Sequence, residues 1–83
     1  MSERSDAAEQ IVSALENAGL EASTWTEAVT RGRIRKVGWG GKGRSGAVVL
    51  VDADDIEVFG SGSGDYADPG SAASAIIDAV GDE

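Results

Sequence analysis

The most constraining feature of the sequence is a continuous apolar run at residues 46–51, Gly-Ala-Val-Val-Leu-Val. A short run without polar alternation is typical of a strand that is covered on both faces. Successive side chains of a strand point to opposite faces, so Val48 and Leu50 share one face. Val49 and Val51 share the other. The rest of the chain must therefore provide apolar cover for a strand with two apolar faces.

The first amphipathic segment spans residues 5–18 and is predicted to be a helix. Ser5 is the expected N-cap, and Gly19 stands where a helix-ending glycine belongs. Leu20 is expected to fold back onto the last turn in a Schellman ending. The apolar stripe at helical spacing consists of Ala8, Ile11, Val12, Leu15 and Ala18.

The second amphipathic segment spans residues 69–80 and is also predicted to be a helix. Asp68 and Pro69 form an N-cap followed by proline at the first helical position, and Gly81 closes the segment. Its apolar stripe is Ala73, Ile76, Ile77 and Val80. Both helices are short and alanine-rich, so they must pack against the strands to be stable. We expect a core that includes Leu15, Val49, Val51, Ile76 and Ile77.

The sequence of residues 23–30 allows two structural interpretations. The segment Thr24–Glu27 matches a capping box, which indicates a short helix. Its β-forming residues and the turn-like pair Arg31-Gly32 indicate a hairpin instead. A turn at 31–32 makes three sensible cross-strand pairs, which favours the hairpin: Val29 with Ile34, Glu27 with Lys36, and Trp25 with Gly38. If the segment were helical, the basic hairpin after it would resemble the wing of a winged-helix DNA-binding domain, but the chain has too few helices for that fold.

Together these segments predict an α+β fold of order α-β-β-β-β-α, an antiparallel meander with two helices packed on one face. The chain is expected to form one domain over residues 1–83, with mobile ends at 1–4 and 81–83. The glycine- and serine-rich residues 60–65 are expected to be a flexible connection.

Two thin helices can cover only one face of this sheet. Simple hairpin registers put Phe59 and Leu50 on the same face as Arg33, Arg35, Val37 and Trp39. The face with Trp39 and Phe59 is then expected to meet water, a partner or another copy of the chain, because exposed apolar patches mark interaction sites.

The charge balance points to a high-salt environment. The chain has 15 acidic and 7 basic residues, a net charge of −8, and Lys36 and Lys42 are its only lysines. This composition resembles that of proteins from extreme halophiles. Self-repulsion at low salt would be screened at molar salt, where the Debye length is about 3 Å. We therefore expect a cytoplasmic protein of an organism that accumulates salt.

The positive charge is concentrated in residues 31–44, which contain six cations and no acid, whereas the other residues carry a net charge of −14. A basic stretch with a tryptophan on an acidic body is typical of an anion or nucleic-acid site, with the aromatic ring stacking on a base. The candidate residues are Arg31, Arg33, Arg35, Lys36, Trp39, Lys42 and Arg44.

Three considerations weigh against nucleic acid. Affinity built on phosphate contacts falls steeply at molar salt. The predicted basic strand lies near Asp52, Asp54, Asp55 and Glu57, which could neutralise it. Trp39 could also be a core residue.

The sequence gives little support for catalysis or for metal binding. The chain has no histidine and no cysteine, so a histidine base, a thiol nucleophile and a zinc finger are excluded. The glycine-rich loop at 40–45 departs from a phosphate-binding P-loop, because Gly43 stands where serine or threonine is required. The acids at 52–57 lack the glycine of an EF-hand loop. We predict no enzyme, no metal and no cofactor, and no run is long enough for a membrane helix.

The leading hypothesis is a non-enzymatic interaction module that binds a protein partner or itself, with a homodimer through the sheet face as one form. The alternative is a nucleic-acid-binding domain that uses the basic hairpin 31–44 with Trp39 stacking.

Overall fold

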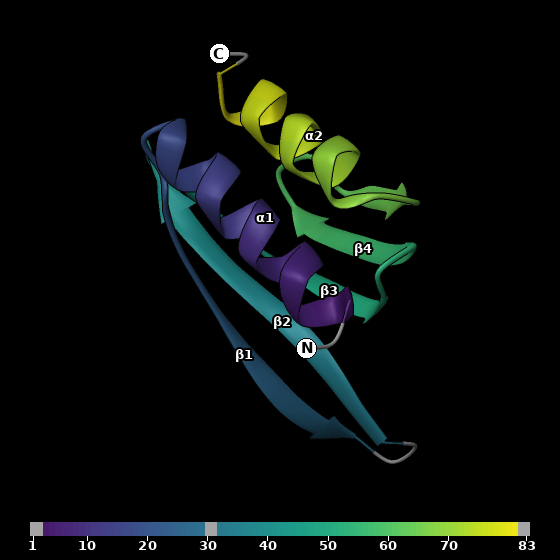
Figure 1. The fold of residues 1–83 in the computed structure, drawn as a ribbon. Helices are drawn as coiled ribbons and strands as arrows, with labels where there is room; N and C mark the ends of the chain where they lie inside the picture. Colours follow the sequence, from purple (N-terminus) through teal and green to yellow (C-terminus); the bar gives the residue numbers. More distant parts are fainter. Residues whose placement is uncertain (1–2, 30–31, 82–83) are drawn as a thin grey trace.

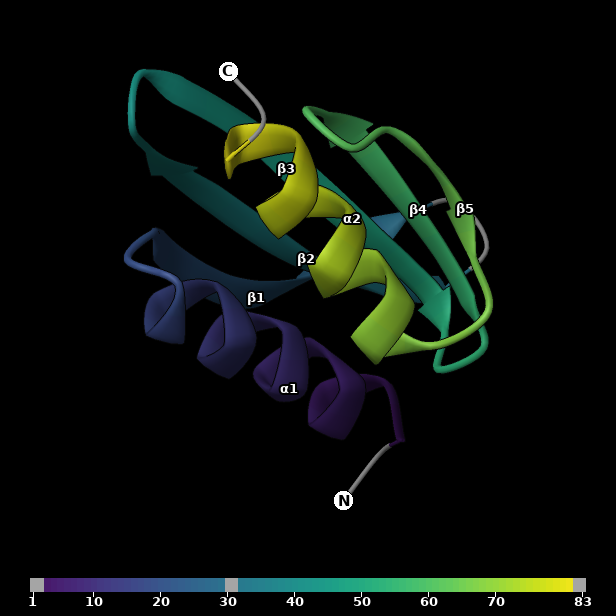
Figure 2. The same cartoon turned by 90° about the horizontal axis from the view of Figure 1, so that it is seen from above.

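The sheet of this protein carries both helices on one face, as the computed structural model shows for residues 3–29 and 32–81 (Figures 1 and 2). In chain order the elements are α1 (Glu3–Asn17), β1 (Glu21–Val29), β2 (Gly32–Gly41), β3 (Arg44–Asp52), β4 (Asp55–Gly60), β5 (Gly64–Tyr66) and α2 (Pro69–Gly81). The strands are antiparallel neighbours in the order β1-β2-β3-β4-β5. The predicted α+β meander with two helices on one face is confirmed, with one strand more than expected.

The additional strand is β5, which lies partly in the segment predicted to be a flexible connection. Tyr66 pairs with Ile56 of β4, and its ring packs against the core. The Tyr66 hydroxyl donates a hydrogen bond to the carbonyl of Gly62 at 2.8 Å. These contacts order the end of the connection, so the prediction of flexibility over 60–65 is wrong for Gly64 and Asp65.

The end of α1 is the predicted Schellman motif. Gly19 has a φ of +90°, and its amide donates to the carbonyl of Glu16 at 3.0 Å. The amide of Leu20 donates to the carbonyl of Leu15 at 3.0 Å, and the Leu20 side chain is buried. Both hydrogen bonds of the motif are therefore present, and Leu20 turns the chain from the helix into β1.

The start of α1 differs from the prediction. The helix begins at Glu3, so Ser5 lies inside its first turn and is not the N-cap. Arg4 Nη1 donates to the carbonyl of Arg33 at 2.5 Å, which ties this turn to β2. Residues 3 and 4, expected to be part of a mobile end, are thus helical, whereas residues 1–2 and 82–83 lie outside the described residues.

The start of α2 follows the predicted cap. The amide of Ser71 donates to Asp68 Oδ1 at 2.8 Å, and the Ser71 hydroxyl donates to Oδ2 at 2.9 Å. Backbone and then side-chain hydrogen bonding by Ser71 lower the pKa of Asp68 below its ordinary value of 3.8. The helix runs to Gly81, one residue beyond the predicted end.

Residues 23–29 form a strand, which confirms the hairpin prediction. The observed β1–β2 register is shifted by two residues from the predicted one. Val29 pairs with Gly32, Glu27 pairs with Ile34, and Trp25 pairs with Lys36. A shift of two residues leaves every side chain on its expected face. Two of the three expected contacts are present as diagonal contacts: Lys36 Nζ lies 3.5 Å from Glu27 Oε2, and the Trp25 ring lies over Gly38.

An irregularity in β3 decides which side of β4 is buried. The turn sets Asp52 opposite Asp55, and continuing that register would set Phe59 opposite Val48. The pairing instead shifts between Leu50 and Asp52, so Phe59 lies opposite Ala47. A one-residue shift turns every side chain of β4 to the other face. Phe59 is therefore on the face opposite Trp39, and the prediction that the two share a face is wrong.

The register shift is explained by which side chains of β4 it buries. Ile56 and Val58 turn toward the helices and are 0% and 2% exposed, whereas Glu57 turns outward. The opposite arrangement would bury a carboxylate, which is costly without a partner.

The core lies between the helices and one face of the sheet. Its members are Ala7, Ala8, Ile11, Leu15, Leu20, Val37, Trp39, Val48, Leu50, Ile56, Val58, Ala72, Ala73, Ile76 and Val80. Leu15 and Ile76 are buried as predicted, whereas Val49 and Ile77 are half-buried. The prediction for Val51 is wrong, because it lies on the uncovered face and is 52% exposed.

Candidate functional site

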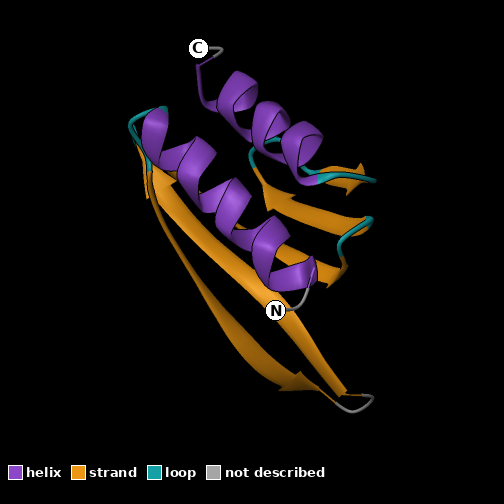
Figure 3. Ribbon diagram, in the orientation of Figure 1, coloured by secondary structure: helices purple, strands orange, loops and turns teal. Residues whose placement is uncertain are grey.

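The face of the sheet turned away from the helices, hereafter the outer face, has no helix over it in the described part of the chain (Figure 3). Strand alternation places Val49 and Val51 on this face beside Ala47 and Phe59. Trp25, Val51 and Phe59 are its large exposed apolar side chains, at 42%, 52% and 48% exposure. The sequence correctly indicates that one apolar face of the central strand lacks cover.

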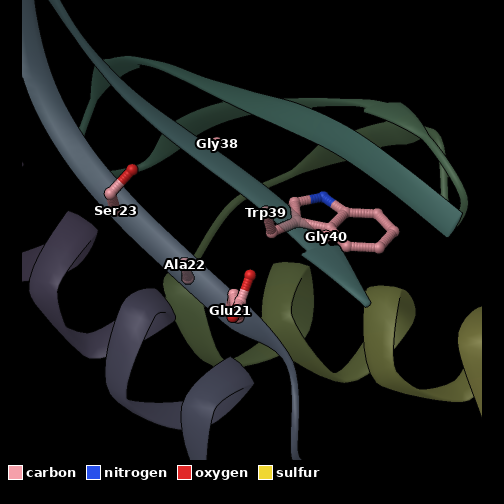
Figure 4. A pocket seen from close by; sticks show the side chains of 6 residues that line it. All are labelled: Glu21, Ala22, Ser23, Gly38, Trp39 and Gly40. Carbon is pink, nitrogen blue, oxygen red and sulfur yellow. The ribbon is translucent and has the colours of Figure 1, made fainter. Parts of the chain in front are cut away.

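Glycines hollow out part of this surface. Trp25 lies against Gly38, and a Cβ added at Gly38 would stand 3.1 Å from the ring carbons Cη2 and Cζ3. Beside it is an open hollow of about 250 Å³ between β1 and β2, shown in Figure 4. Its lining residues are Glu21, Ala22, Ser23, Gly38, Trp39 and Gly40. Gly38 and Gly40 have no side chains to fill the hollow, so backbone forms part of its floor.

The charges of the outer face are mainly negative. Lys36 lies on β2, next to the central strand β3, and it forms an ion pair with Glu27 of β1. The outward carboxylates belong to the flanking strands β1, β4 and β5: Glu21, Glu27, Glu57 and Asp65. The outer face thus has an apolar centre on β2 and β3 with acids on both flanks.

Trp39, the predicted stacking residue, is in the core. Its side chain points to the helix side of the sheet and is 5% exposed. A Cβ added at its cross-strand neighbour Gly46 would stand 2.8 Å from Cζ2 of the indole. The indole Nε1 is buried and has no hydrogen-bond partner among the described residues. The placement corrects the stacking assignment, because neither ring face is open to a base.

The described cations of this segment, at residues 33–44, do not form one patch. Arg33 and Arg35 lie near the start of β2, on the helix side of the sheet. Lys36 points to the outer face, while Lys42 and Arg44 lie at the other end of the strand, in or next to the β2–β3 turn. Lys42 Nζ donates to the carbonyl of Ala18 at 3.4 Å, close to the end of α1. Arg31 lies outside the described residues.

The structure adds a cation that the sequence did not single out. Arg4 reaches from α1 to Arg33, a residue 29 positions away in the chain. Arg35 lies beside the same contact, where Arg4, Arg33 and Arg35 line a small hollow. No local pattern marks Arg4, because its role depends on how α1 is set on the sheet. Nucleic-acid binding by the predicted cations stays a prediction, now without Trp39 as its stacking residue.

The acidic segment after β3 is a turn. Asp52 Oδ1 accepts a hydrogen bond from the amide of Ala53 at 2.8 Å, which shapes the β3–β4 connection. Within residues 3–29 and 32–81, no group of three or more acids is arranged to hold a metal ion.

No family model, curated protein or solved structure matches this chain. Of the two described helices, neither has the length and hydropathy needed to cross a bilayer. The function is therefore inferred from the geometry of the surfaces described above.

Proposed function

We propose that this protein is a non-enzymatic interaction module that pairs with a second copy of itself through the outer face, in a salt-rich cytoplasm. The observation that carries the proposal is the exposure of Trp25, Val51 and Phe59 on a sheet face that neither of the described helices covers. Large apolar side chains gathered on one face are typical of an interface rather than of a solvated sheet.

The size of the face suits a small homodimer. Four strands spaced about 4.8 Å apart and about seven residues long cover roughly 450–500 Å² of flat surface. Two such faces in contact would bury on the order of 1,000 Å², which is near the lower bound for a specific interface. Two sheets packed face to face at about 10 Å would leave room for the aromatic side chains to interdigitate.

The arrangement of side chains also suits a second copy. A two-fold axis parallel to the strands sets β1 of one copy opposite β4 of the other, which brings Trp25 near Phe59 of the partner. The half-buried Val49 and Ala47 lie at the centre of such an interface. Acids on the flanks form a polar rim, the usual anatomy of a protein interface.

The same acids disfavour nucleic acid on this face. Glu21, Glu57 and Asp65 would repel a phosphate backbone, and Lys36 is already paired with Glu27. Two acidic faces also repel one another, but molar salt screens that repulsion. We therefore expect the dimer to strengthen with KCl, whereas phosphate contacts would weaken.

The proposal of a non-enzymatic role is supported by composition. The chain contains no histidine and no cysteine, the side chains most often used as general bases and thiol nucleophiles. A shallow hollow floored by glycine backbone offers little to orient a substrate.

Sedimentation equilibrium in 0.2 M and 2 M KCl tests the proposal. We expect a monomer–dimer equilibrium that shifts toward dimer at 2 M KCl, and a monomer at both concentrations for Phe59→Glu. Ser13→Glu is the matched control, because it adds the same charge on the exposed side of α1. A wild-type chain that stays monomeric in 2 M KCl, or equal dissociation by both variants, would contradict the proposal.

A further inference from the structure

Three arginines meet at a small hollow on the helix side of the sheet, away from the outer face. Arg4 comes from the first turn of α1, and Arg33 and Arg35 come from β2. The hollow has a volume of about 60 Å³. Its lining residues are Arg4, Ser5, Thr26, Arg33, Ile34 and Arg35.

Arg35 is held in place by the neighbouring strand. Its Nε donates to Thr24 Oγ1 at 3.0 Å, and its Nη1 donates to Thr26 Oγ1 at 2.9 Å. The Thr24 hydroxyl in turn donates to the carbonyl of Lys36 at 2.7 Å. A guanidinium group has five N–H donors, so these contacts orient the group and leave three donors for another acceptor.

Arg4 is fixed by its hydrogen bond to the carbonyl of Arg33. This contact brings the cation of α1 to the two cations of β2 and uses one of its donors. The Arg33 side chain is exposed beside it. The fold therefore assembles the three positive charges from segments that are 29 residues apart.

The guanidinium groups at this hollow form no ion pair with acids of the described residues. In residues 3–29 and 32–81, no carboxylate lies within 4 Å of the guanidinium groups of Arg4, Arg33 or Arg35. Acids outnumber basic residues by 15 to 7 in this chain, so three cations without a neighbouring carboxylate are unusual. Three converging cations repel each other, and an anion between them removes that cost.

We propose that Arg4, Arg33 and Arg35 form a binding site for one phosphate group of a small molecule. Three guanidinium groups present more donors than the two oxygens of a carboxylate can accept, whereas a tetrahedral phosphate offers more oxygens and more charge. The hollow of about 60 Å³ has room for several water molecules, which suits one phosphate group. The site is independent of the proposed dimer, because it lies on the opposite side of the sheet.

Titration with inorganic phosphate and with pyrophosphate in 0.1 M KCl tests the site, followed by the NMR signals of the arginine Nε–H groups. We expect saturable shifts at Arg35 and a dissociation constant that rises about tenfold in Arg33→Gln and in Arg4→Gln, the usual effect of one charged hydrogen bond. Lys42→Gln is the matched control, since it removes one charge at the far end of β2. Far-ultraviolet circular dichroism establishes that each variant is folded.

The outcomes separate this site from the alternatives. Saturation in the wild type, with loss confined to the two arginine variants, supports the proposal. No saturation by 50 mM phosphate (about 50-fold above a dissociation constant of 1 mM), or an equal loss in Lys42→Gln, overturns it. A short single-stranded oligonucleotide that binds more tightly than pyrophosphate, and is weakened equally by Lys42→Gln, would replace the single-phosphate site with an extended nucleic-acid surface.

Discussion

Trp39 and Gly46 face each other across β2 and β3, and the indole occupies the space that a Cβ of residue 46 would need. That Cβ would stand 2.8 Å from Cζ2 of Trp39 and 2.5 Å from the carbonyl oxygen of Phe59. Only glycine lets the two strands close around the ring, so the core tryptophan depends on Gly46.

Gly46→Ala should therefore destabilise the fold by about 1–3 kcal/mol, the cost of overpacking a core. Gly38→Ala is the paired comparison: its Cβ would stand 3.1 Å from the Trp25 ring, which is 42% exposed and can swing outward. We expect Gly38→Ala to cost less than about 1 kcal/mol. Urea unfolding of both variants measures the difference, and a larger loss for Gly38→Ala would contradict this account of the two tryptophans.

The two faces of the sheet should also differ in their response to truncation. Leu15 is fully buried, so Leu15→Ala should lower the free energy of unfolding by about 2–5 kcal/mol. Val51 is 52% exposed, so Val51→Ala should change it by less than about 0.5 kcal/mol in the monomer. Chemical denaturation at low salt and micromolar concentration provides both values. Similar losses for the two variants would mean that the outer face is not open in solution.

The ends of the helices were predictable because their signals are local. Gly19 and Leu20 specify the Schellman ending within a few residues, and Asp68 with Pro69 specifies the start of α2. The faces of β1 and β2 were also predictable despite the shifted register, because a two-residue shift preserves side-chain direction. Local chemistry and strand periodicity therefore account for most of the fold.

The outer face and the arginine cluster depend on contacts between distant segments, which no local sequence pattern indicates. The register shift near Val51 turned Phe59 away from Trp39, and only the competition to bury Ile56 and Val58 rather than Glu57 accounts for it. The arginine cluster needs Arg4, whose position beside Arg33 follows from helix docking. The uncovered face was foreseeable from the apolar run at 46–51, and Phe59 was correctly expected on it, but Trp39 was wrongly placed there and Val51 was expected in the core.

The cap of α2 predicts a specific dependence on pH. Hydrogen bonds from Ser71 lower the pKa of Asp68 below 3.8, so the ionised cap stabilises the folded state. For a lowered folded pKa, this contribution is complete above the unfolded value and is lost as pH falls through the folded value. Asp68→Asn retains an acceptor for the cap but cannot titrate.

The difference in melting temperature between the wild type and Asp68→Asn should therefore shrink as pH falls from about 5 to about 2.5. Asp78→Asn is a charge-matched control on the exposed side of α2. Thermal unfolding followed by circular dichroism gives the three curves. A wild-type advantage that stays constant over this range would show that the Asp68 charge does not stabilise the helix.

Salt is expected to stabilise each folded chain as well as the proposed dimer. A net charge of −8 on 83 residues generates self-repulsion in the folded state, and above about 1 M KCl the Debye length of about 3 Å is shorter than most charge separations. The melting temperature should therefore rise with KCl.

A rise in melting temperature that depends on protein concentration reports dimerisation by mass action, whereas a rise that persists in monomeric Phe59→Glu reports relief of repulsion within the chain. Differential scanning calorimetry of both proteins, from 0.05 M to 3 M KCl (roughly an eightfold range of Debye length) and at two protein concentrations, separates the effects. A Phe59→Glu chain that is no more stable in 3 M KCl than in 0.05 M KCl would contradict the interpretation of the acidic composition as an adaptation to salt.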